Sequence, residues 1–92
     1  MPYKKLLSAV TTTGASTAYA WQGGFGTVVV SDIGTGGVTM QASADGGTVY
    51  EAMGSDTTFT ADGMANFQLG AGMLVRALVT TASSTGVVVT IS

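Results

Sequence analysis

Short segments in which apolar and polar residues alternate recur along the chain. The clearest is 38–43, where three apolar residues at even positions alternate with three polar residues at odd positions. The same period of two is present at 64–69 and 73–80. Because successive side chains of a strand point to opposite faces, this period predicts strands with one buried face.

Other segments are short runs rich in Val, Thr and aromatic residues, which suit a pleated sheet. The 14 Gly residues separate these segments and interrupt most windows long enough for a helix. For 4–10 a short helical turn is the alternative to a strand. The predicted strands are 3–11, 18–22, 25–31, 38–43, 48–53, 57–60, 64–69, 73–80 and 87–91.

Eight or nine short strands with frequent turns are typical of a sandwich or barrel. We therefore predict an all-β fold, a two-layer antiparallel β-sandwich of jelly-roll type. A chain of 92 residues has room for one core, so 1–92 is expected to be a single domain. Residues 1–11 are expected as an extended N-terminal arm or an edge strand.

Two predicted strands are apolar on both faces, at Val28-Val29-Val30 and Val87-Val88-Val89. A sandwich strand normally has a polar outer face, so a second apolar face indicates cover by another chain. Charged residues make up 9% of the chain, against about 25% in ordinary soluble domains. A neutral, charge-poor surface favours an assembled protein, and we expect self-association.

The basic residues are few and form no patch. Lys4 and Lys5 are adjacent, whereas Arg76 stands alone, so no nucleic-acid partner is expected. The five-residue apolar run that follows Lys5 is shorter than the roughly 7–15 residues of a signal-peptide core. No segment approaches the ~20 apolar residues of a membrane-spanning helix, and no membrane partner is expected.

The chemistry of common active sites is missing from the sequence. The chain has no His and no Cys, so it offers no imidazole base and no thiolate. Its Gly-rich segments precede no helix whose N-terminus could bind a phosphate. We predict a protein that is not an enzyme and has no catalytic residue and no cofactor.

Four aspartates lie beside Gly or Ser, where turns are predicted: Asp32, Asp45, Asp56 and Asp62. Asp is a favoured turn residue because its side chain accepts hydrogen bonds from nearby backbone N–H groups. We therefore predict no metal site, with calcium held by these carboxylates as the alternative.

The segment Ser43-Ala44-Asp45-Gly46-Gly47 predicts a hairpin, because Asp-Gly supplies the positive φ of a tight turn. With Tyr50 it resembles in part the Asp-box hairpin of sialidase-type propellers. That motif is a turn device, so the resemblance implies no activity.

Aromatic residues offer a second class of function. An exposed platform of Tyr19, Trp21, Phe25 and Tyr50 would suit sugars, whereas buried aromatics would be core or interface anchors. Arg76 lies in an apolar strand and needs a carboxylate such as Glu51 or an interface. The candidate interface residues are Tyr3, Lys4, Lys5, Tyr19, Trp21 and Arg76.

Several of these segments resemble small structural proteins of tailed phages, in particular capsid decoration, or cement, proteins. The resembling segments are LLSAVT at 6–11, AWQGGFGT at 20–27, VTMQAS at 38–43, DG at 45–46, GSDTT at 54–58, NFQL at 66–69 and MLVRA at 73–77. Members usually carry a Pro before the strand that bears the Arg, where this chain has Gly-Ala-Gly at 70–72.

The resemblance implies a β-sandwich that binds the major capsid protein as a trimer and stabilises the shell. Its location would then be the outer surface of the virion capsid, after assembly in the host cytoplasm. A phage tail, neck or fibre component is the second structural hypothesis. A carbohydrate-binding module is the alternative from another class.

Overall fold

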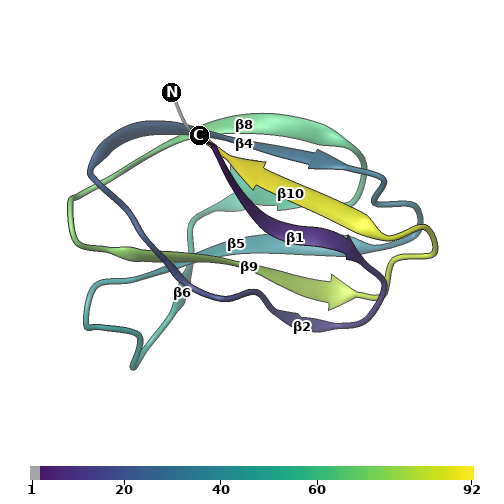
Figure 1. Ribbon diagram of the computed structural model, residues 1–92, viewed down its shortest axis with the longest axis horizontal. Coiled ribbons are helices and arrows are strands. Elements are labelled where there is room, and N and C mark those ends of the chain that lie inside the picture. Colours follow the sequence, from purple (N-terminus) through teal and green to yellow (C-terminus); the bar gives the residue numbers. More distant parts are fainter. Residues whose placement is uncertain (1–2) are drawn as a thin grey trace.

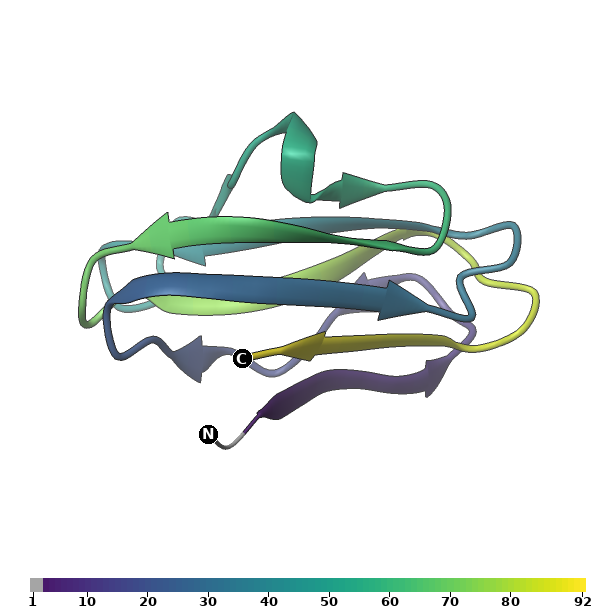
Figure 2. The ribbon, with the colours of Figure 1, turned by 90° about the horizontal axis from the view of Figure 1, so that it is seen from above.

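The computed structural model describes residues 3–92 as two antiparallel sheets packed face to face (Figures 1 and 2). The first, sheet A, has the strand order β1-β10-β4-β8. Its strands are β1 (Lys4–Val10), β10 (Val87–Ile91), β4 (Gly24–Ser31) and β8 (Gly63–Leu69).

Sheet B is built around two long strands, β9 (Leu74–Thr81) and β5 (Gly37–Ser43). Two short strands, β2 (Gly14–Ala15) and β3 (Tyr19–Ala20), pair with β9 one after the other. On the other side, β6 (Glu51–Ala52) and β7 (Thr58–Phe59) both pair with β5, and the 3-10 turn η1 (Ser55–Thr57) lies between them. Each short pair therefore occupies the place of one interrupted strand.

The ten strands of residues 3–92 thus fill eight positions. Numbered along the chain, these positions follow the orders 1-8-3-6 in sheet A and 2-7-4-5 in sheet B. This arrangement is the double Greek key of a jelly roll. The predicted all-β, two-layer antiparallel sandwich is confirmed.

The predicted strands agree best where the alternation is strongest, at β5, β8 and β9. The strand predicted over 48–53 is reduced to Glu51–Ala52, because the preceding residues form a hydrogen-bonded turn. The short β2 was not predicted, since Gly-Ala carries no apolar alternation.

The core lies between the two sheets, and Val is its most frequent residue. In β4, Val28 and Val30 are buried while Val29 between them is 38% exposed. In β10, Val87 and Val89 are buried, and Val88 is half-buried on the outer side. The two strands that are apolar on both faces therefore form the middle of sheet A.

The N-terminal segment is an edge strand in this structure. Among residues 3–92, β10 is the one strand that pairs with β1, and register shifts on both sides of Leu7 make this pairing irregular. Met1 and Pro2, part of the expected arm over 1–11, lie outside the described residues. No helix among the described residues is long and apolar enough to cross a membrane.

Candidate functional site: a neutral sheet face and an acidic groove

The outer side of sheet A is a surface with few charges, which we call the neutral face. Strand register places its residues side by side: Val29 is opposite Met64 and also opposite Thr90. In the next rows Thr27 is opposite Asn66, and their side chains share a hydrogen bond of 2.9 Å. The neutral face comprises Phe25, Thr27, Val29, Met64, Asn66, Gln68, Val88 and Thr90.

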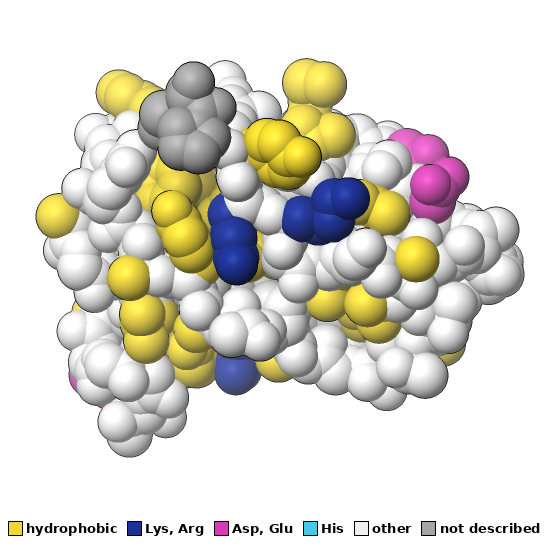
Figure 3. Space-filling view, viewed as in Figure 1, with side chains coloured by type: hydrophobic (Ala, Val, Ile, Leu, Met, Phe, Trp, Pro, Cys, Tyr) yellow, Lys and Arg dark blue, Asp and Glu magenta, His cyan; other side chains and the backbone are white. Residues whose placement is uncertain are grey.

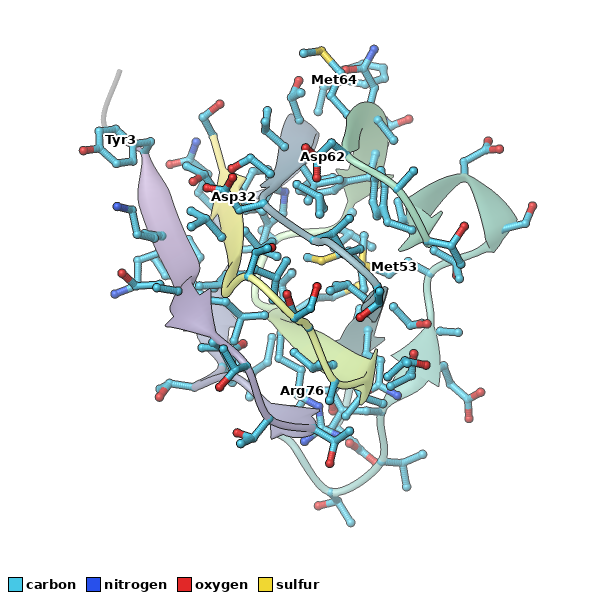
Figure 4. All side chains as sticks on the ribbon, turned by 90° about the vertical axis from the view of Figure 1, so that its right-hand side faces the viewer. Tyr3, Asp32, Met53, Asp62, Met64 and Arg76 are labelled. Carbon is cyan, nitrogen blue, oxygen red and sulfur yellow. The ribbon has the colours of Figure 1, made fainter. Side chains whose placement is uncertain are left out.

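Large apolar side chains on the neutral face are open to solvent. Phe25 is 78% exposed and Met64 is 69% exposed. Figure 4 shows Met64 projecting away from the sandwich. Lys5, opposite Thr90, is the charged residue at the margin of this face. An uncharged face with exposed apolar groups is typical of a protein-binding surface.

The sequence indicated one part of this face and missed another. The apolar run 28–30 pointed to Val29, because the middle residue of three in a strand faces away from the other two. Phe25 was considered only as part of an exposed aromatic platform, and Met64 was missed as a surface residue, since it was taken as an end of a predicted strand. The polar residues Asn66 and Gln68 could have identified Met64 as a surface residue, because they share the outer face of the strand with it.

A groove of about 690 Å³ lies beside the neutral face, between the end of β8 and residues 51–57. Its apolar lining includes Met53, Phe67, Leu69 and Met73. Phe67 belongs to the core, and Met53 and Leu69 pack against it. Its charged lining consists of three carboxylates, those of Asp45, Glu51 and Asp56, and no basic residue contributes.

The hairpin after β5 positions the first of these carboxylates. Ser43 donates its hydroxyl hydrogen to Asp45 Oδ1 at 2.7 Å and accepts the Gly47 N–H at 3.0 Å. The Val49 N–H also donates to Asp45 Oδ1, at 3.0 Å. The Val49 N–H and then the Ser43 hydroxyl lower the pKa of Asp45. The segment acts as the predicted turn.

The six candidate interface residues do not form one surface. Tyr3, Lys4 and Lys5 are exposed at β1. On the β1 side of the molecule, seen in Figure 3, basic side chains lie near the centre of a largely uncharged face. Arg76 lies across the sandwich from Tyr3 (Figure 4).

Tyr19 and Trp21 contribute mainly to the interior. Trp21 is 4% exposed and packs on Phe67 with ring centroids 4.9 Å apart. Its indole N–H donates to the Gly24 carbonyl at 3.2 Å, which satisfies this buried donor. Tyr19 is half-buried against the same core. With Trp21 inside, the four aromatic residues do not form an exposed sugar platform.

Arg76 is held on the outer side of sheet B. Its Nε donates to Gln41 Oε1 at 2.8 Å, and its guanidinium carbon lies 3.7 Å from the centroid of the Tyr50 ring. These two contacts take the place of the carboxylate partner suggested by the sequence, Glu51.

The carboxylates of residues 3–92 do not gather into a group of three or more that could hold a metal ion. Asp62 instead accepts the Ile33 N–H at 3.0 Å and so fixes the loop after β4. Asp32 lies in the same loop with a φ of 55° (Figure 4).

Comparison with known proteins gives fold relationships alone. No family model matches the chain, and no curated protein matches it in sequence. The crystal structure of the SPBc2 prophage-derived protein YomS superposes with a TM-score of 0.78 at 15% identity, covering 98% of this chain and 88% of that one.

Two further structures share the fold more loosely. The Yersinia pseudotuberculosis-derived mitogen has a TM-score of 0.57 at 9% identity, covering 98% of this chain and 80% of its own. Aeromonas hydrophila PliG, a periplasmic inhibitor of g-type lysozyme, has a TM-score of 0.54 at 15% identity, and the match covers 99% of this chain and 82% of PliG. The same fold therefore occurs in proteins with different roles.

Proposed function

We propose that this chain is a structural protein of a phage particle, a capsid decoration protein that binds the shell through its neutral face. The observation that carries this proposal is the exposure of Phe25 and Met64 on a nearly uncharged sheet face. Such side chains lose unfavourable contact with water when another protein covers them.

Two independent likenesses support a phage particle as the place where this chain functions. Segments of the sequence resemble small structural proteins of tailed phages, and the fold is that of a prophage-derived protein. Binding by surface contact needs no catalytic group, which agrees with a chain that has no His and no Cys.

The test uses particles of the phage whose genome encodes the chain, prepared without this protein. We expect them to lose infectivity at a lower temperature than complete particles, and added purified wild-type chain to restore their heat tolerance. Met64→Lys should fail to restore it, because a charge on the neutral face would be buried against the shell. Heat tolerance measured as surviving titre is the readout.

The matched control is Thr80→Lys, which adds the same charge at an exposed position of β9 in sheet B. This variant should restore heat tolerance as the wild type does. Equal heat tolerance of particles with and without the chain would contradict the cement role. Immunogold labelling of tails instead of heads would place the protein in the tail or neck.

A further inference from the structure

The free edge of β8 presents unpaired backbone groups. Thr27 exchanges both of its backbone hydrogen bonds with Ser92, at 2.9 and 3.0 Å, so its N–H and C=O point towards β10. Antiparallel pairing alternates, so the backbone groups of Gly26 and Val28 point towards β8. Their partners are Phe67 and Ala65, which leaves the backbone groups of Asn66 and Gln68 pointing outward.

This edge lacks several of the features that normally prevent strand addition, although the 3-10 turn η1 packs near it. β8 runs for seven residues, from Gly63 to Leu69, without a charge, a Pro or a register shift. Natural edge strands are usually protected by such features. The groove with its acidic lining opens on the inner side of the same edge.

The opposite edge of sheet A carries the complementary charge. In β1, Lys4 is opposite Ile91, a core residue, and Lys5 is opposite Thr90 on the outer face. Residues opposite each other share a face. Lys4 therefore extends on the inner side of the sheet and Lys5 on the outer side, although both are exposed because β1 is the last strand.

We propose that a second copy of this chain places its β1 beside β8, so that sheet A continues from one copy to the next. The successive pairings of sheet A are antiparallel, so β1 and β8 run in opposite directions within one copy. A rotation about an axis parallel to the strands leaves the strand directions unchanged, so β1 of one copy runs antiparallel to β8 of the other. Its backbone bonds would use the free groups of Asn66 and Gln68.

Charge selects this pairing over its alternatives. The incoming Lys4 falls on the groove side of the sheet and meets Glu51 and Asp56, whose carboxylates line the groove. Pairing β1 with β1 would bring lysines together, and pairing β8 with β8 would bring the acidic grooves together. A head-to-tail contact gives a closed ring where the rotation closes. The contact uses the two edges of sheet A and leaves Phe25 and Met64 uncovered, so shell binding itself does not depend on it.

The experiment measures the mass of the purified chain by light scattering and its dissociation constant by analytical ultracentrifugation. The wild type should have a mass well above the 9.1 kDa of a single chain at micromolar concentration. Lys4→Glu should raise the dissociation constant at least about tenfold, because the charge facing the groove is reversed.

The adjacent Lys5→Glu is the matched control. It makes the same change of charge on the other face of the strand, and it should shift the dissociation constant by less than about threefold. Glu51→Lys with Asp56→Lys in the Lys4→Glu background should restore association, since both sides of the contact are then reversed. Circular dichroism checks that each variant is folded.

A monomer mass for the wild type at micromolar concentration would overturn the proposal, as would equal effects of Lys4→Glu and Lys5→Glu. If Glu51→Lys with Asp56→Lys does not restore the association of the Lys4→Glu variant, the groove is not the contact and the proposal is also overturned. The result is independent of the particle experiment, because none of these variants changes Phe25 or Met64.

Discussion

At the scale of single residues, Gly26 shows how one position decides the packing between the sheets. It is buried in β4 opposite Phe67, and its φ is not unusual. A Cβ built there would lie 2.5 Å from Trp21 and 2.6 Å from Phe67. The two rings therefore occupy the space that any larger residue would need.

Gly26→Ala should lower the free energy of unfolding by about 1–3 kcal/mol, because the rings must move to admit the methyl group. Chemical denaturation followed by Trp21 fluorescence measures the change. Gly70→Ala is the control, since a Cβ there would meet nothing within 4 Å. A loss equal to that of Gly70→Ala would show that the aromatic pair is not tightly packed.

The hydrogen bonds to Asp45 predict that the stability of the hairpin depends on pH. Its pKa is lowered by the Val49 N–H and the Ser43 hydroxyl, which bond the charged form. A carboxyl group whose pKa is lower in the folded state stabilises the fold at pH values above its unfolded-state pKa. This stabilisation is lost as the pH falls through the folded-state pKa. The turn should therefore loosen as the pH falls below the ordinary Asp pKa value of 3.8.

Nuclear magnetic resonance can follow this loosening through the exchange of the Val49 and Gly47 amide hydrogens. Asp45→Asn should weaken the pH dependence of their protection, whereas Asp56→Asn, at an exposed carboxylate without a hydrogen bond described in the structure, should leave it unchanged. Protection that stays constant in the wild type over this range would contradict the role of the carboxylate.

At the scale of elements, two loops at one end of the sandwich are joined by a single buried hydroxyl. Ser83 is 5% exposed, donates to the Ile33 carbonyl at 2.8 Å and accepts the Gly86 N–H at 3.1 Å. It thereby links the loop after β4 to the loop between β9 and β10. These two loops connect sheet A with sheet B, so Ser83 fixes how the layers meet at this end.

Ser83→Ala should destabilise the fold by about 1–3 kcal/mol, because buried backbone groups lose their partner. Thermal unfolding of this variant and of Ser84→Ala gives the comparison. Ser84 is exposed and accepts one bond, from the Thr35 N–H, so its removal should cost less than half as much. Similar losses for the two variants would argue against the buried link.

At the scale of the whole molecule, the jelly roll separates two surfaces with different properties. The neutral face of sheet A is suited to covering by another protein, and the groove beside it is acidic. The basic residues of β1 lie at the opposite edge of the same sheet. Because proteins of this fold have different roles, these surfaces carry the functional argument and the fold does not.

The sequence by itself determined the class of the fold and most of its strands. Alternation at 38–43 and 73–80 fixed which side chains face the core, because the period of a strand leaves no other choice. The hairpin at Asp45 was also predictable, since its hydrogen bonds are local. The lack of His and Cys led to the prediction that the chain is not an enzyme, which stays a prediction.

Tertiary structure alone decided which segments share a surface. Tyr3 and Arg76 appeared as members of one candidate interface, yet they lie on opposite sides of the sandwich. Trp21 appeared as an anchor, and its ring is buried because Gly26 leaves room for it beside Phe67. The groove unites Asp45, Glu51 and Asp56 with β8 across the gap between the sheets. Strand order creates such neighbours, and strand order depends on long-range pairing that local pattern does not encode.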